Sequence, residues 1–218
     1  MRPINVQKVD KPIPIFTTEI PDKDRINQEL LQYIERHRHK YTSCKMTNLK
    51  CDWRSSFDMH IECPEPIVKE LVDFSLEVAT HLSSYYQKDL KIPFLIDNFW
   101  CAEYEEGNSA RNHTHYPADW AAVYYILVEE HASPLVFEDK LAVDPEPGML
   151  VIFPGTTFHR VKPTKGRRVC AAMNIHKSPY KEWENMNGGF EDKVFDRNLS
   201  KLEAVSYTHL TLPTIYSV

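Results

Sequence analysis

Hydrophobic residues follow a helical spacing in the first part of the chain and a strand-like spacing in the second. Apolar side chains recur at helical intervals from Ile26 to Ile34 and between Ile67 and Leu82, where Pro66 suits the first turn of a helix. After residue 93 the pattern changes to short aromatic and β-branched runs separated by turn signals. The chain therefore predicts two helices followed by strands. The strands are expected at residues 94–104, 120–128, 135–138, 149–153 and 168–176, with an edge strand at 13–16.

Short strands at this spacing, with no helical pattern between them, are typical of an antiparallel jelly roll or barrel. Helices first and strands afterwards make the fold class α+β. We expect residues 1–92 to form an extended segment with supporting helices, and residues 93–204 to form the barrel. Residues 205–218 continue no earlier pattern and resemble a translated sequencing adapter, so we interpret them as a non-native tail and leave them out of the site.

Composition narrows the classes of partner. The net charge of −5 provides no basic field for a nucleic-acid backbone, which argues against a nucleic-acid partner. Five cysteines without a C-x-x-C pair indicate free thiols in a reducing compartment. The first residues lack the apolar run of a signal peptide, and no stretch is long and apolar enough to span a membrane. We therefore expect a cytoplasmic protein; its oligomeric state is not encoded in these patterns.

Three histidines form a candidate metal site. His113 and His115 lie two residues apart, and in an extended backbone both side chains project from the same face. His159 follows the predicted strand 149–153 by a short turn and can supply a third ligand. Three protein ligands on one side of an ion leave positions open for a chelating substrate and O2, which is the arrangement of non-haem Fe(II) oxygenases.

Two further features bear on the assignment of a metal site: a second histidine pair that cannot bind one, and an arginine near His159. A second H-x-H pair, His37 and His39, falls on a predicted helix, where its side chains point about 200° apart and cannot share a metal. Arg168 begins an apolar strand nine residues after His159, where a buried guanidinium can bind a carboxylate. Its neighbour Arg167 is expected to point to the opposite face of that strand.

Between residues 98 and 176 the motifs resemble, in their order, those of the 2-oxoglutarate/Fe(II)-dependent dioxygenases, and in particular a phage and marine-bacterial branch similar to prolyl hydroxylases. The matching segments are His113-Thr-His115, Ala121-Ala-Val-Tyr-Tyr125, Pro145-Glu-Pro-Gly-Met-Leu-Val-Ile-Phe-Pro154, His159-Arg-Val-Lys-Pro163 and Gly166-Arg-Arg168.

This resemblance implies a double-stranded β-helix that uses Fe(II), O2 and 2-oxoglutarate as co-substrate. The implied reaction hydroxylates a C–H bond of a small-molecule or peptidyl substrate and gives succinate and CO2 as co-products. His113 and His159 would bind the iron, and Arg168 would pair with the distal carboxylate of 2-oxoglutarate. Tyr125 and Tyr104 occupy positions from which related enzymes hydrogen-bond the co-substrate. The implied setting is the cytoplasm of a bacterium or of a phage-infected host.

One position departs from the family pattern. The family usually has H-x-D or H-x-E, whereas here the acidic position is His115. Three interpretations stay open: His115 is itself the third ligand, Asp119 supplies a carboxylate from the following loop, or the site binds metal poorly and has lost its activity. Without an anionic ligand the electrostatic hold on Fe(II) is weaker.

Two other classes of protein fit part of the pattern. A three-histidine cupin-type dioxygenase chelates its organic substrate directly and needs no 2-oxoglutarate. A non-catalytic jelly-roll binding module would hold no stoichiometric metal. Arg168 separates the first of these from a 2-oxoglutarate enzyme, because a cupin-type enzyme has no need of a buried cation for a co-substrate carboxylate.

Overall fold

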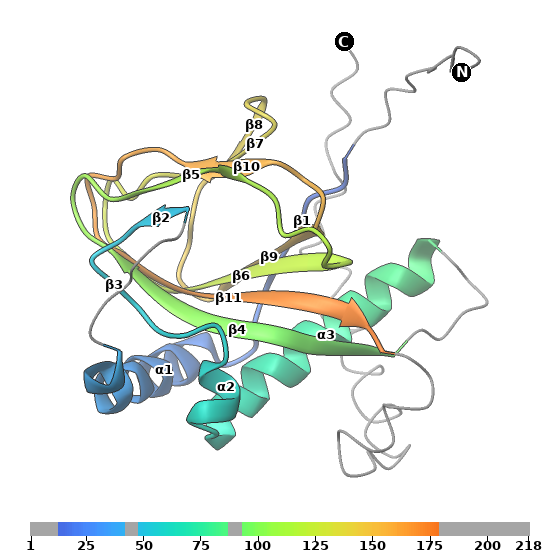
Figure 1. Cartoon of the computed structure of the whole chain (residues 1–218), viewed down its shortest axis with the longest axis horizontal. Helices are drawn as coiled ribbons and strands as arrows, with labels where there is room; N and C mark the ends of the chain where they lie inside the picture. The colour runs from blue at the N-terminus through green and yellow to red at the C-terminus, as the bar shows by residue number, and fades with distance from the viewer. Residues whose placement is uncertain (1–12, 42–47, 87–92, 179–218) are drawn as a thin grey trace, which may run out of the picture.

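Two antiparallel sheets face each other in a computed structural model that describes residues 13–41, 48–86 and 93–178 (Figure 1). Helices lie against the outer face of the larger sheet (Figure 1). The predicted α+β class and the jelly-roll barrel are confirmed. The division at residue 92 stays a prediction, and the tail at 205–218 lies outside the described residues.

The larger sheet contains six strands and the smaller sheet contains five. In spatial order the larger sheet is β1 (Phe16–Glu19), β9 (Met149–Pro154), β6 (Trp120–Val128), β11 (Arg168–Lys177), β4 (Phe94–Tyr104) and β3 (Trp53–Arg54). The smaller sheet is β2 (Leu49–Lys50), β5 (Ser109–His113), β10 (His159–Val161), β7 (Leu135–Phe137) and β8 (Leu141–Val143).

The helices cover one face of the larger sheet. They are α1 (Lys23–His37), continued by the 3-10 turn η1 (Arg38–Lys40), the short α2 (Met59–Glu62) and α3 (Pro66–Tyr86). Their apolar faces bury side chains such as Leu30 and Leu71 against the sheet. The Tyr124 hydroxyl donates a 2.6 Å hydrogen bond to Asn27 Oδ1, which fastens β6 to α1.

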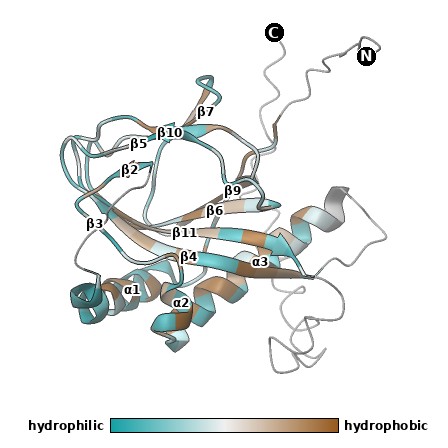
Figure 2. Ribbon diagram, in the orientation of Figure 1, coloured by the Kyte–Doolittle hydropathy of each residue, from teal (hydrophilic) through white to brown (hydrophobic). Residues whose placement is uncertain are grey.

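Both faces of the larger sheet are buried, which explains why its central strands lack a polar alternation. Along β6, Ala122 and Tyr124 pack against the helices, whereas Ala121, Val123 and Tyr125 line the interior between the two sheets. Figure 2 shows the corresponding hydrophobic stretches along these strands and on the helices beneath them. The interior between the sheets is the space into which a site can open.

The structure departs from the predicted strands at the N-terminal edge and in the smaller sheet. The edge strand occupies Phe16–Glu19 rather than residues 13–16, and it pairs with β9. The strands β5 and β10 were not predicted, because each is short and rich in polar residues.

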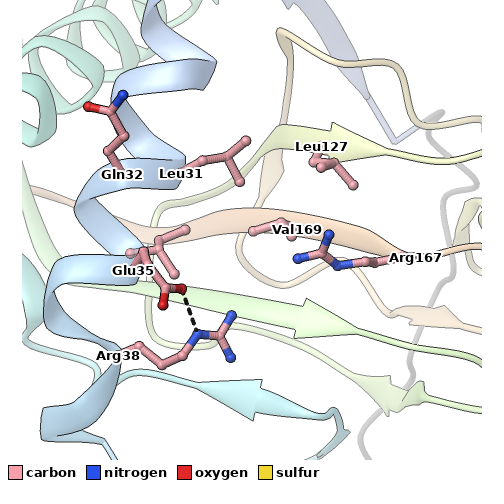
Figure 3. A pocket seen from close by; sticks show the side chains of 8 residues that line it. Leu31, Gln32, Glu35, Arg38, Leu127, Arg167 and Val169 are labelled. Carbon is pink, nitrogen blue, oxygen red and sulfur yellow. Dashed lines mark ion pairs between the residues drawn. The ribbon is translucent and has the colours of Figure 1, made fainter.

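An ionic network joins α1 to the start of β11. The buried Glu103 carboxylate accepts hydrogen bonds from Arg38 and from Arg167 Nε, the latter at 2.7 Å. Burial alone would raise the pKa of Glu103, but the hydrogen bonds from the two guanidinium groups outweigh it, and the pKa is lowered. Figure 3 shows Arg38 and Arg167 beside a groove between α1 and the sheet. Arg167 thus points away from the barrel interior, as predicted.

No helix among the described residues is long and apolar enough to cross a membrane. The cytoplasmic location stays a prediction.

Candidate metal and co-substrate site

The smaller sheet brings two of the candidate histidines face to face. His113 is the last residue of β5, His159 is the first residue of β10, and the two are directly paired in the ladder between these strands. His115 lies in the loop after β5, where its backbone N–H donates a 2.7 Å bond to the Gly155 carbonyl. Cross-strand pairing, rather than one extended segment alone, therefore gathers the three side chains.

The three imidazoles converge on one point. One ligand nitrogen from each of His113, His115 and His159 lies within 4.8 Å of the others. The Nε2 atoms of His115 and His159 are 3.2 Å apart. Two nitrogens bound at about 2.1 Å to one ion lie roughly 3.0 Å apart at an octahedral angle and roughly 3.4 Å apart at a tetrahedral angle. The observed separation therefore fits two ligands of a single metal ion.

Hydrogen bonds at the opposite ring nitrogens set the tautomer of each histidine. His113 Nδ1 lies 2.6 Å from the backbone carbonyl oxygen of Arg111, and His159 Nδ1 lies 3.0 Å from that of Thr157. His115 Nδ1 lies 2.6 Å from the side-chain amide oxygen of Asn174. A carbonyl oxygen only accepts, so each Nδ1 carries the proton and donates. Each Nε2 is consequently left with its lone pair directed into the cluster, which is the state that binds a metal.

The surroundings keep the cluster uncharged at neutral pH. Burial lowers the pKa of all three histidines, to about 4 for His115 and about 3 for His159. Neutral imidazole is the metal-binding form, so a metal ion need not displace protons from these rings near pH 7.

Aromatic side chains pack against two of the three rings. Trp100 stacks on the His115 ring at 5.7 Å between centroids, and Phe153 packs edge-on against His159 at 4.7 Å. These contacts restrict how far the rings can turn.

Asp119 does not share this cluster. Its Oδ2 atom accepts a 2.9 Å hydrogen bond from the Lys177 backbone N–H, and its Oδ1 atom lies 3.2 Å from Lys177 Nζ. The carboxylate is thus engaged with the end of β11, and the described residues that could hold one metal ion together are the three histidines. Of the two sequence interpretations that complete the site, the geometry favours His115.

The second part of the site is a buried cation. The Arg168 side chain lies in the barrel interior, 4.6 Å from the Tyr104 ring centroid and 5.3 Å from that of Tyr125. Its Nη1 donates a 3.0 Å hydrogen bond to the Ser133 carbonyl, while Nε has no hydrogen-bond partner within the described residues. No acidic side chain of the described ranges forms an ion pair with it. The Ser133 carbonyl and the two rings stabilise the buried guanidinium only in part, and a buried cation without an acidic partner is costly, so its position suits an anionic ligand.

Tyr125 adds a second polar group beside the Arg168 guanidinium. Burial raises its pKa to about 12, so the phenol is a neutral donor, and its hydroxyl has no partner in the part of the chain that the structure describes. Arg168 and Asn174 lie an even number of residues apart on β11, and their contacts place both side chains on the inner face. The inner face of β11 therefore carries both Arg168 and, further along the strand, Asn174, which hydrogen-bonds a histidine of the metal cluster.

Solved structures with the same architecture bear on this arrangement. A prolyl-4-hydroxylase from Pseudomonas putida matches with a TM-score of 0.57 and 16% identity, covering 76% of this chain and 94% of its own. The prolyl hydroxylase from Trichoplax adhaerens, in complex with a hypoxia inducible factor oxygen degradation domain peptide fragment, matches with a TM-score of 0.54 and 14% identity over 73% and 82% of the two chains. The fold is that of the prolyl hydroxylases.

The same fold occurs in the viral collagen prolyl hydroxylase of Paramecium Bursaria Chlorella virus-1, whose structure holds 2-oxoglutarate. It matches with a TM-score of 0.52 and 15% identity over 74% of this chain and 96% of that one. No protein-family model and no curated protein matches the sequence. At such low identity the prolyl-hydroxylase fold is established by shape, and the chemistry of the site must be argued from its own residues.

The structure places the six candidate residues in the same interior: the three histidines, Arg168, Tyr125 and Tyr104. The sequence analysis assigned no role to Asn174 or Asn98. The Asn174 side chain supports His115, and Asn98 supports Asn174 through a 2.8 Å bond from Asn174 Nδ2. A partial signal was present in the sequence: Asn98 precedes the apolar run Phe-Trp-Cys-Ala, and Asn174 follows the apolar run Val-Cys-Ala-Ala-Met. Both side chains are half-buried, where a polar group still gains from a partner, and for Asn174 that partner is a site histidine.

Gly155 holds the loop that carries His115. Its N–H bonds the Asp119 carbonyl, and a Cβ atom at this position would lie 2.1 Å from the Ala118 carbonyl oxygen. We expect Gly155→Ala to push this loop away, to destabilise the protein by about 1–3 kcal/mol and to weaken metal binding. Urea unfolding and a cobalt titration of the same variant measure both effects. Unchanged stability and affinity would show that the loop accommodates the methyl group freely.

Proposed function

We propose that this protein is an Fe(II)- and 2-oxoglutarate-dependent dioxygenase that hydroxylates a C–H bond of its substrate. His113, His115 and His159 would hold the iron, and Arg168 would bind the distal carboxylate of 2-oxoglutarate with Tyr125 and Tyr104 beside it. The observation that carries the proposal is the presence, inside one barrel, of a three-nitrogen metal site and a buried guanidinium that has no acidic partner among the described residues.

The residues of the chain have separate tasks in this reaction. When bound, iron with 2-oxoglutarate and O2 supplies the oxidising power, and succinate and CO2 are the co-products. The histidines fix the ion on one side and leave its other side open. Arg168 and the Tyr125 hydroxyl orient the co-substrate by its far carboxylate. Interior residues such as Phe153 and Val151 keep water from the reacting atoms.

The charge of the centre distinguishes it from one with a carboxylate ligand. Three neutral imidazoles add no negative charge, so the dianionic co-substrate alone offsets the charge of Fe(II). We therefore expect iron to bind more weakly alone than in the presence of 2-oxoglutarate, because the co-substrate supplies the missing anionic donors.

The substrate class is proposed as a small molecule or a peptidyl segment. A peptide is present in the Trichoplax adhaerens structure that shares this fold, which supports the peptidyl option. The net charge of −5 offers no basic surface field for a nucleic acid.

The ligand set itself favours one second candidate, a cupin-type dioxygenase that chelates its organic substrate directly. That class fits the absence of a carboxylate from the cluster of described residues. It leaves the buried guanidinium of Arg168 without a purpose, and for this reason we rank it second.

Isothermal titration of the manganese-loaded protein under nitrogen separates the two candidates. The account expects 2-oxoglutarate to bind, while pyruvate, which lacks the distal carboxylate, and glutarate, which lacks the chelating keto group, bind far more weakly. Manganese binding without discrimination among these three acids would contradict the proposal and favour the cupin-type alternative.

A further inference from the structure

The three histidines of the cluster differ in what fixes their tautomer. His113 and His159 donate from Nδ1 to backbone carbonyls within their own strand or turn, so chain geometry sets them. His115 lies outside a regular strand and donates instead to the side chain of Asn174, 59 residues away in sequence. The orientation of His115 therefore depends on another side chain.

A second amide fixes the orientation of that acceptor. Asn174 on β11 is paired with Asn98 on β4 in the sheet ladder, and its Nδ2 donates a 2.8 Å hydrogen bond to Asn98 Oδ1. Because Nδ2 is used in this way, Oδ1 is the atom presented to His115. The bond of 2.6 Å then requires the His115 proton on Nδ1.

The opposite tautomer would disable the cluster. If the His115 proton moved to Nε2, it would face the lone pair of His159 Nε2 at a separation of 3.2 Å, which is a hydrogen-bonding distance. The two histidines would then bond to each other and leave only His113 with a free nitrogen pointing at the ion. A device that keeps the proton on Nδ1 is therefore needed for metal binding.

We propose that Asn174 is a positioning residue of the metal centre, which holds His115 as the third ligand, with Asn98 fixing the Asn174 amide. This inference rests on the three-histidine metal site of the proposed function. An amide acceptor orients the imidazole as a carboxylate does in other metal sites, but it adds no charge. At the position that usually carries an acidic ligand, this chain thus has the neutral His115, which is held by the neutral side chain of Asn174.

Cobalt(II) binding to the full chain, followed by visible absorption, tests this role. Asn174→Leu keeps the approximate volume and removes the acceptor, and we expect its cobalt affinity to fall about 10- to 100-fold. Asn174→Asp restores an acceptor and should recover most of the affinity. Met173→Leu, which changes the neighbouring residue on the helix-facing side of β11, is the matched control and should bind as the wild type does.

A double-mutant cycle separates positioning from general stability. In a His115→Ala background, Asn174→Leu should cause no further loss of cobalt affinity, because the group it orients is gone. An equal loss in both backgrounds, or wild-type affinity in Asn174→Leu, would overturn the inference and leave the metal site intact. Failure of the wild type to bind cobalt would overturn the metal site and this inference together, whereas cobalt binding without 2-oxoglutarate binding would reject only the proposed reaction.

Discussion

Replacement of His159 is expected to weaken metal binding more than any other single change in the cluster's surroundings, and to remove every activity that depends on the bound metal. His159 is buried, starts β10, pairs with His113 across the ladder and directs Nε2 to within 3.2 Å of His115 Nε2. Its loss leaves two ligands with no third nitrogen to close the face, so we expect affinity to fall by more than the roughly 100-fold that follows loss of a supporting contact. His159→Gln, which fills the space, is preferable to alanine because Phe137 and Phe153 pack on the ring.

His39→Ala is the control for that experiment. His39 belongs to the other H-x-H pair and is exposed in the turn η1, and it is part of no group of three potential metal ligands among the described residues. Its variant should bind metal as the wild type does. Equal metal content in His159→Gln and the wild type would place the metal elsewhere in the chain.

Removal of the Arg168 charge is expected to separate stability from function. Arg168→Met exchanges a buried guanidinium for an apolar side chain of similar length. The affinity for 2-oxoglutarate should fall roughly 30-fold or more, equivalent to about 2 kcal/mol or more for a broken buried ion pair. The melting temperature of the ligand-free variant should change little, because the lost Ser133 hydrogen bond and tyrosine ring contacts are offset by removal of a buried charge without an acidic partner. Calorimetry and thermal unfolding of one preparation measure both quantities.

Arg167→Gln is the matched control, because this neighbour faces the other side of the strand. Its partner Glu103 keeps the second guanidinium of Arg38, so the fold should be preserved. Co-substrate affinity should remain that of the wild type. A large loss of 2-oxoglutarate binding in Arg167→Gln, or none in Arg168→Met, would contradict the assignment of the buried cation.

The long strands could be predicted from the sequence because most of their residues are apolar and buried. The predicted limits 94–104 and 120–128 coincide with β4 and β6, whose apolar runs are bounded by proline or turn residues. The short strands β5 and β10 could not be predicted, since they depend on pairing with each other and with β2 and β7. A residue such as Arg111 in β5 carries no strand signal of its own.

The candidate site divides in a similar way. Sequence spacing was sufficient to nominate the three histidines and Arg168, because the order of the motifs fixes which strand ends meet. It could not choose between His115 and Asp119, because that choice depends on where a loop side chain points. Nor could it pair Asn174 with His115, since the contact joins residues 59 positions apart. Long-range side-chain hydrogen bonds leave no periodic trace in a sequence.

An anaerobic titration of the metal-free protein with Fe(II) and 2-oxoglutarate tests the central claim most directly. Chelation of ferrous iron by the keto acid gives a visible metal-to-ligand charge-transfer band. The account predicts a band that requires both components, is absent in His159→Gln and needs far more 2-oxoglutarate in Arg168→Met. Bound iron with no band at saturating 2-oxoglutarate would contradict the claim that this barrel binds both the metal and the co-substrate.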